Sequence, residues 1–290
     1  MHTKSELLEL LRAHGIRLNK RLGQHYLIDP RLCARLVGLC DLSAEDTIIE
    51  IGAGLGALTD LLAARTKRVV AVEVDRAICE LLKTRMAHVP NVEVHCQDIL
   101  TIRWAEYPGS KVVGAIPYQI TSPLLVSLCE HATDIPEAWL GLQREVAQRL
   151  CARPGTKAYG RLTILVQYRF AVQQQARIPR AAFFPQPEVD SVWLHLFAHH
   201  TPLVSVKDAS LLFDVVRAAF SQRRKTLLNC LTQLARPRLT RHDALELIRA
   251  SQLPVGIRGE ELSLESFARL ANTMVMSQFP GQGAPRERHV

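Results

Sequence analysis

Four short segments carry the residues best suited to chemistry, and each follows or ends a run of apolar residues. The first is the glycine-rich segment 50–56, where Gly52, Gly54 and Gly56 alternate with other residues. Glycine at such positions lets a ligand approach the backbone closely. The spacing differs from the G-x-G-x-x-G pattern of nicotinamide dinucleotide sites, which makes an oxidoreductase a distant alternative. A tight turn between a strand and a helix would use the same glycines.

Acidic residues stand at the ends of the second and third apolar runs. Glu73 follows Gly52 at about the separation at which nucleotide-binding folds place the acid that accepts hydrogen bonds from a ribose. Asp98 follows the next run and is suited to accept from the exocyclic amine of adenine. Either acid alone would equally suit a helix N-cap or a solvated charge. With the glycine segment they predict a pocket for an adenosine without a pyrophosphate, and S-adenosylmethionine is the obvious candidate.

The fourth segment, 114–118, sets Pro117 beside Tyr118 at the mouth of the same expected pocket. An aromatic ring there can stack on a base that has left its helix, and a backbone carbonyl beside a proline can accept from an exocyclic amine. The alternative is a plain exit from a strand, with Tyr118 packed in the core.

Apolar runs alternate with helical patterns between about residues 30 and 125, which is typical of a parallel sheet built from strand–helix units. The expected strands are 47–51, 68–72, 92–96, 111–113 and 137–142. The expected helices in this half are 57–64, 76–88, 122–131 and 144–151. Residues 161–170 and 183–196 have the pattern of further strands. Thr3 and Glu6 have the spacing of a capping box ahead of a short N-terminal helix.

Beyond residue 200 the pattern changes to helices alone. They are expected at 209–220, 225–234, 241–250 and 263–274. The sequence therefore predicts an α/β fold in two domains. Residues 1–200 form a Rossmann-like domain with a basic N-terminal arm, and residues 201–290 form a small helical domain with a frayed C-terminal tail.

Charge and cysteine usage narrow the class of protein. The 290 residues include 36 Lys and Arg against 28 Asp and Glu, a formal net charge of +8. This excess favours a polyanionic partner, because Lys and Arg supply most sequence-independent affinity for nucleic acid. No run of about 18 apolar residues and no signal-peptide pattern is present, so we expect a cytoplasmic protein without membrane contact. The seven cysteines form no C-x-x-C pair, and we expect reduced thiols with neither a disulfide nor a metal site.

These segments, in this order, resemble the ribosomal RNA adenine dimethyltransferases, whose bacterial members methylate two adjacent adenosines near the 3′ end of small-subunit ribosomal RNA. Besides the four segments above, the similarity covers residues 20–27, 143–150, 184–191, 223–227 and 262–270. The resemblance implies a Rossmann-like S-adenosylmethionine-dependent methyltransferase domain followed by the helical domain. It also implies a monomer that acts on RNA of the immature 30S subunit during ribosome biogenesis.

The resemblance further implies which residues bind the cofactor. His25 and Leu27 would cover its methionine and ribose end, and Gly52 would line the glycine loop. Glu73 would hold the ribose and Asp98 the adenine. Members of the family commonly have asparagine at the position of His25, a mild departure because imidazole can still donate a hydrogen bond.

A larger departure falls on Ala115, which would contact both cofactor and target. The family motif has asparagine here, and its side chain accepts from the target amine. A methyl group accepts nothing, and loss of one such bond costs about 2 to 4 kcal/mol of transition-state stabilisation, or about a hundredfold in rate. The carbonyl of Pro117 and the ring of Tyr118 would remain, with Gln119 or a water as a partial replacement. We therefore expect an enzyme with a weakened acceptor, which Ala115→Asn should improve.

Five basic residues are expected to bind RNA. They are Lys20 and Arg21 near the cofactor pocket and Arg223, Arg224 and Lys225 at the start of a helix in the second domain. A short basic run is by itself more often a solvated face, and only the fold context favours RNA. Two alternatives to a small-subunit dimethyltransferase stay open. One is a ribosome-assembly factor of the same fold that has lost catalysis through Ala115, and the other is a methyltransferase acting on large-subunit RNA.

Overall fold

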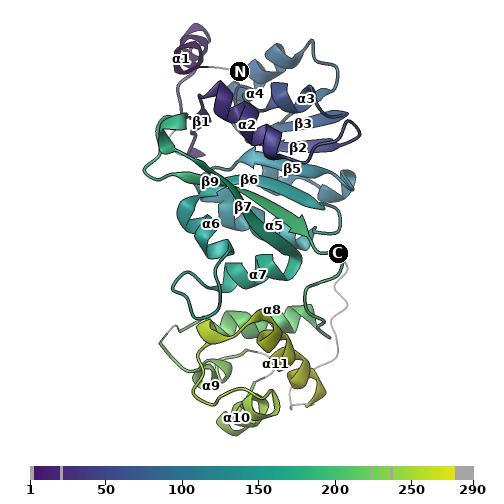
Figure 1. The fold of residues 1–290 in the computed structure, drawn as a ribbon, viewed down its shortest axis with the longest axis vertical. Coiled ribbons are helices and arrows are strands. Elements are labelled where there is room, and N and C mark those ends of the chain that lie inside the picture. Colours follow the sequence, from purple (N-terminus) through teal and green to yellow (C-terminus); the bar gives the residue numbers. More distant parts are fainter. Residues whose placement is uncertain (1–2, 20–21, 223, 236–237, 278–290) are drawn as a thin grey trace. The chain divides into compact units, whose positions relative to one another are not determined.

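The computed structural model describes residues 3–19, 22–222, 224–235 and 238–277, which divide into two compact units (Figure 1). Unit 1 comprises residues 1–148 and 169–200, and unit 2 comprises residues 149–168 and 201–290. The sequence predicts one boundary near residue 200, whereas the chain also passes between the units at 148/149 and 168/169. The segment 149–168, expected in the first domain, groups with the helical one.

Unit 1 is built on a seven-stranded sheet with the order β4-β3-β2-β5-β6-β9-β7. Its strands are β2 (Thr47–Ile51), β3 (Arg68–Glu73), β4 (Val92–Cys96), β5 (Lys111–Ala115), β6 (Glu137–Gln143), β7 (Phe170–Ile178) and β9 (Ser191–Ala198). Strands β2 to β6 pair in parallel, and β9 is antiparallel to both β6 and β7. The predicted α/β class with a parallel sheet is confirmed. The order of strands reverses between β2 and β5, and this is where open α/β sheets bind their ligands.

The helices of unit 1 are α1 (Lys4–Ala13), α2 (Pro30–Leu39), α3 (Thr59–Ala63), α4 (Arg76–Met86) and α5 (Thr121–Glu130), with α6 (Arg144–Leu150) at the passage to unit 2. Three of them, α1, α2 and α4, begin at a side-chain cap. Asp29 and Asp75 each accept from two backbone amides at the starts of α2 and α4. The expected capping box of Thr3 and Glu6 is present at α1.

A two-stranded antiparallel sheet ties the N-terminal segment to a distant part of unit 1. Strand β1 (Tyr26–Leu27) pairs with β8 (Phe183–Phe184), with Tyr26 opposite Phe184 and Leu27 opposite Phe183. The backbone amide of Ile28 extends the pairing by donating to the carbonyl of Ala182 at 2.9 Å. This small sheet fixes the segment that enters the site described below.

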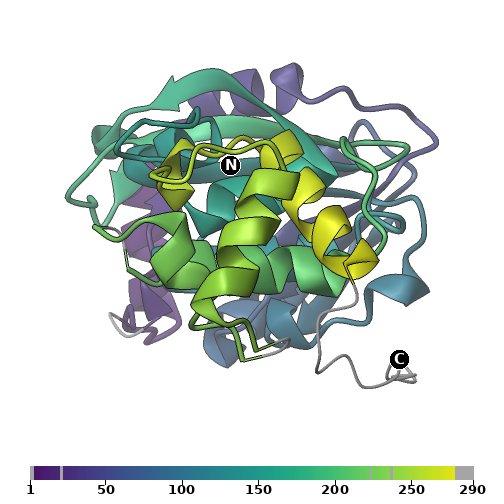
Figure 2. The same cartoon turned by 90° about the horizontal axis from the view of Figure 1, so that it is seen from below.

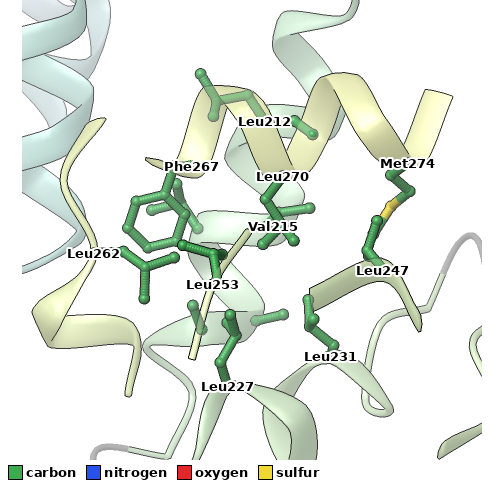
Figure 3. Close-up of a cluster of buried hydrophobic side chains, with 14 of the residues drawn as sticks. Leu212, Val215, Leu227, Leu231, Leu247, Leu253, Leu262, Phe267, Leu270 and Met274 are labelled. Atoms are coloured by element: carbon green, nitrogen blue, oxygen red, sulfur yellow. The ribbon is translucent and has the colours of Figure 1, made fainter. Parts of the chain in front are cut away.

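Unit 2 is helical, as the sequence predicts beyond residue 200. Its helices are α7 (Arg161–Arg169), α8 (Ala209–Ala219), α9 (Leu227–Leu231), α10 (Arg241–Ala250) and α11 (Leu264–Met276). Figure 2 shows α8 to α11, coloured green to yellow, gathered together. Their core residues recur at helical spacing, for example Phe267, Leu270 and Met274 on α11, which point inward with Leu212 and Val215 of α8 (Figure 3).

The predicted strand over residues 161–170 is wrong, because this segment forms α7 and the strand β7 begins only at Phe170. The β-branched residues Thr163, Ile164 and Val166 favour a strand by propensity. In the structure Ile164 and Tyr168, four residues apart, lie in the same core cluster of unit 2. Burial of one helical face therefore outweighs the local preference.

The expectation that every cysteine is a free thiol is wrong for Cys79 and Cys96, which form a disulfide. Cys79 lies on α4 and Cys96 at the end of β4, and the fold packs this helix against this strand. Their separation in sequence matches no recognisable motif, so the pairing follows from tertiary structure alone. The other five cysteines, all within the described residues, form no disulfide.

Candidate functional site

The carboxyl ends of β2, β3 and β5, with the segment after β4, open into one cavity. The structure brings together all the residues predicted to bind the cofactor, since each of them lines this cavity. They are His25, Leu27, Gly52, Glu73, Asp98 and Ala115. Pro117 lines it as well, whereas Tyr118 lines a smaller neighbouring cavity.

The glycine segment serves two different purposes. At Gly54 (φ +56°) a Cβ would lie 3.0 Å from two ring atoms of Tyr26, so this glycine makes room for the protein's own aromatic ring. At Gly52 (φ +66°) the nearest atoms to a Cβ would be the carbonyl of Ala115 and Cδ of Pro117, both at 3.8 Å. Gly52 is therefore the position where the loop leaves space for a ligand against the end of β5.

Glu73 lies buried at the end of β3 and clamps the glycine loop. Its Oε2 accepts from the backbone amide of Gly54 and its Oε1 from that of Asp75, both at 2.9 Å. Burial raises the pKa of Glu73, and the two amide hydrogen bonds oppose that shift. Each carboxylate oxygen keeps a further lone pair that can accept from a hydroxyl in the cavity.

Asp98 caps a turn and also lines the cavity. Its Oδ1 accepts from the backbone amide of Leu100 at 2.9 Å and so caps the turn Ile99–Thr101. Its neighbours in the cavity wall include the exposed side chain of Val74 and the buried side chain of Ile99. The interpretation of Asp98 as a cap is confirmed, and the carboxylate still has an acceptor oxygen beside an apolar slot.

Sequence reasoning missed the role of Gln24, which holds one wall of the cavity. Its Nε2 donates to Oδ2 of Asp75, and its Oε1 accepts from the backbone amide of Asn19, each at 2.9 Å. Asp75 is the cap of α4, so the N-terminal segment is fixed to the helix that follows Glu73. The sequence signal for Gln24 was its position within residues 20–27, one of the segments that resemble the dimethyltransferases.

Glu50, also missed as a functional residue, lies beneath the loop at the end of β2. It lines the cavity, is 1% exposed, and accepts from Oγ1 of Thr59 at 2.6 Å. Burial raises the pKa of Glu50 to about 8, so the side chain is largely protonated at pH 7. The sequence signal for it was an acid at the first position of the glycine-rich segment 50–56.

A smaller cavity adjoins the first, and three residues, His25, Ala115 and Pro117, line both. Tyr118 lines the smaller cavity, and its hydroxyl lies 3.3 Å from Oγ of Ser191. The carbonyl of Pro117 already accepts from the amide of Ile120 at 3.2 Å and from Oγ1 of Thr121 at 3.4 Å. This carbonyl, expected from the sequence to hold an amine, therefore has both lone pairs engaged.

Comparison with known proteins identifies the family of this chain. A family described as "Ribosomal RNA adenine dimethylase" matches residues 15–273. The chain belongs to the ribosomal RNA adenine dimethylase family. The predicted family and enzyme class, an S-adenosylmethionine-dependent methyltransferase, are confirmed.

Relatives of this dimethylase-family chain match it over nearly its full length. Ribosomal RNA small subunit methyltransferase A of Geobacillus sp. (strain WCH70) is 37% identical over 281 residues, which cover 94% of this chain and 97% of the relative. The protein of the same name from Bacillus mycoides (strain KBAB4) is 38% identical over 286 residues, with the same coverage.

Two solved structures share the fold at 26% identity. A dimethyladenosine transferase from Plasmodium falciparum superposes with a TM-score of 0.73 over 85% of this chain and 96% of that one. The 23S rRNA methyltransferase ErmE superposes with a TM-score of 0.67 over 86% of this chain and 99% of that one. The predicted Rossmann-like methyltransferase fold with C-terminal helices is confirmed.

The structure of this dimethylase-family chain describes two of the five predicted RNA-binding residues. Lys20, Arg21 and Arg223 lie outside the described residues. Arg224 and Lys225 are exposed in the turn between α8 and α9, ahead of a helix that begins at Leu227 and not at 225 as expected.

Among the residues that the structure describes, no group of His, Cys, Asp and Glu side chains could hold a metal ion. No helix in the same part of the chain is long and apolar enough to span a bilayer.

Proposed function

We propose that this protein transfers methyl groups from S-adenosylmethionine to the exocyclic amines of two adjacent adenosines near the 3′ end of small-subunit ribosomal RNA. The observation that carries the proposal is the meeting of two cavities at Ala115 and Pro117. One has the acceptors that an adenosine needs, and the other has an aromatic ring suited to a base. The relatives named small subunit methyltransferase A support the choice of subunit.

The larger cavity fits the cofactor by the chemistry of its lining. Glu73 offers two carboxylate oxygens to the ribose hydroxyls, and Asp98 offers an acceptor to the adenine amine beside the apolar side chains of Val74 and Ile99. Gly52 leaves the loop backbone open. When bound, S-adenosylmethionine supplies an electrophilic methyl group on its sulfonium sulfur.

The lining of the smaller cavity offers a surface for the target base. The ring of Tyr118 offers a stacking surface, and its hydroxyl is steadied by Ser191. Catalysis then depends mainly on the orientation of the target amine, because orientation alone lowers the barrier substantially. The lone pair of the amine has to point toward the larger cavity at the place where the two cavities share their lining. The side chain of Ala115 contributes no hydrogen bond to that alignment.

The absence of an acceptor at residue 115 makes one substitution a direct test. Because Ala115 lines both cavities, Ala115→Asn places an amide at the wall that they share. We expect the rate of methyl transfer to rise about tenfold. Loss of one acceptor costs about a hundredfold in rate, and other groups in the site already compensate for part of that loss. The measurement is incorporation of labelled methyl from S-adenosylmethionine into immature 30S subunits that lack the modification.

The same assay separates the alternatives. If the parent and Ala115→Asn both bind 30S subunits but neither transfers a methyl group, the chain is an assembly factor, the alternative that Ala115 itself favours. Transfer to unmodified 50S particles in preference to 30S would support the large-subunit alternative. Ala115→Ser is the matched control, because it adds a polar atom too short to bridge the two cavities and should change the rate less than threefold.

A second prediction concerns the binding of RNA by unit 2. Neutralising both exposed residues, Arg224→Gln with Lys225→Gln, should weaken RNA binding and lower the slope of log affinity against log salt by about 1.4 to 1.8, as expected for two lost phosphate contacts. Cofactor affinity should not change. The control is Lys67→Gln with Arg103→Gln, which removes two exposed charges that already pair with Glu45 and Glu106. An equal loss of slope in the control pair would contradict a specific contact at the turn.

A further inference from the structure

The proposed function leaves one chemical question, which is what accepts a hydrogen bond from the target amine in a chain with alanine at 115. Four side chains that line the smaller cavity can be compared as acceptors. Ala115 has no polar atom, and the hydroxyls of Tyr118 and Ser191 lie within hydrogen-bond distance of one another. The fourth side chain is the imidazole of His25, which lines both cavities.

The protonation pattern of His25 is set by its backbone partner. Its Nδ1 lies 2.6 Å from the carbonyl oxygen of Pro185. A carbonyl oxygen only accepts, so Nδ1 carries the hydrogen and donates it. In the neutral ring Nε2 is then the nitrogen with a free lone pair, and this is the tautomer that can accept a hydrogen bond or a proton.

The fold holds this ring in place rigidly. Tyr26 pairs with Phe184 across the β1–β8 sheet, so His25 and Pro185 occupy the next positions on the two strands. The pairing that fixes the strands therefore also fixes the hydrogen bond between residues 160 apart in sequence. The ring of His25 lies 5.6 Å from that of Tyr118, centroid to centroid, beside the surface proposed to stack on the base.

We infer that Nε2 of His25 is the acceptor for the target amine in this chain, and that it replaces the side chain missing at Ala115. The inference rests on the proposed function. The amine nitrogen forms its new bond to the methyl carbon as the methyl–sulfur bond breaks, and that bond's electron pair stays on sulfur. The amine's proton passes to Nε2, which gives a doubly protonated imidazole that later returns the proton to solvent. His25 both orients the amine and receives its proton.

Gln119 is the rival acceptor, and its position favours it less. Its side chain is exposed and lies against Gly23, where an ideal Cβ would come 3.6 Å from Cδ of Gln119. Gln119 lines the larger cavity, but it is absent from the lining of the smaller one. By the cavity that it lines, Gln119 belongs to the cofactor site.

The test is a cycle of substitutions in the full chain. His25→Ala should lower turnover at saturating S-adenosylmethionine about a hundredfold when residue 115 is alanine, and less than threefold in the Ala115→Asn background. His25→Gln keeps a comparable size but binds no proton, so it should give an intermediate loss and guards against misfolding of the alanine variant. Gln119→Ala should change turnover less than twofold in both backgrounds. A loss from His25→Ala that is equal in both backgrounds overturns the inference, and so does a large loss from Gln119→Ala alone.

Two measurements do not depend on turnover. Nitrogen-15 spectra of the neutral imidazole, assigned by comparison with His25→Ala, should show the hydrogen on Nδ1 of His25, and a hydrogen on Nε2 would overturn the inference. Calorimetric titration should show that His25→Ala weakens the cofactor Kd by the same factor in both backgrounds, because the cofactor contact of His25 does not depend on residue 115, and a loss of affinity confined to the alanine background would also overturn the inference. If neither the parent nor Ala115→Asn forms product, the proposed function itself fails, whatever tautomer the spectra show.

Discussion

Replacement of Glu73 by glutamine should weaken S-adenosylmethionine binding about a thousandfold. The carboxylate is buried, accepts from the amides of Gly54 and Asp75, and keeps one lone pair on each oxygen for a ribose hydroxyl. Hydrogen bonds to a charged group are worth about 1.5 to 3 kcal/mol each, so two of them reach the 4 kcal/mol that a thousandfold change requires. In Glu73→Gln the side-chain amide would also turn a donor toward one backbone N–H, which loosens the glycine loop.

Isothermal titration with S-adenosylmethionine measures this effect directly. The matched control is Glu93→Gln on the neighbouring strand β4, where the carboxylate is paired with Arg68 at 2.7 Å and lies outside the cavity. That variant should bind the cofactor as the parent does. A loss of less than tenfold in Glu73→Gln would mean that the ribose is held elsewhere. Titration with a nicotinamide dinucleotide should give no binding in any of the three proteins.

The parts of the site that the sequence revealed are those built from local pattern. The glycine segment, Glu73 and Asp98 each follow a strand whose apolar run is visible in the sequence, and parallel strands bring their carboxyl ends to one edge. The same logic placed Ala115 and Pro117 beside them. Neither the sheet order nor the side-chain partners had to be known for these residues to meet.

The parts that the sequence did not reveal depend on contacts between distant segments. The hydrogen bond from His25 to Pro185 requires the β1–β8 pairing, and nothing in the sequence of these two-residue strands shows that they pair. The disulfide between Cys79 and Cys96 depends on α4 packing against β4. Likewise, α7 is a helix because Ile164 and Tyr168 reach a core formed mainly by residues after 200, which outweighs their local preference.

Glu50→Gln should make the protein more stable at alkaline pH, by about 5 kcal/mol at pH 9. Burial raises the pKa of Glu50 from its ordinary 4.5 to about 8 in the folded protein. Between these two values the unfolded chain has released the proton while the folded chain still holds it, so the parent loses stability as pH rises. Glutamine cannot ionise, and its amide can still accept from Thr59. The stability difference between variant and parent should therefore be small near pH 4.5, grow with pH and level off above about 8.

The measurement is urea unfolding of parent and variant at pH 5, 7 and 9, followed by circular dichroism. Other titrating groups are common to both proteins, so the difference in unfolding free energy isolates residue 50. Glu130→Gln, an exposed acid at the end of α5, is the matched control, and its difference from the parent should not grow with pH. A constant difference for Glu50→Gln across this range would show that the carboxyl group beneath the glycine loop is ionised in the folded protein. The loop would then rest on a buried negative charge held by Thr59, and the cofactor cavity would carry two anions, Glu50 and Glu73, instead of one.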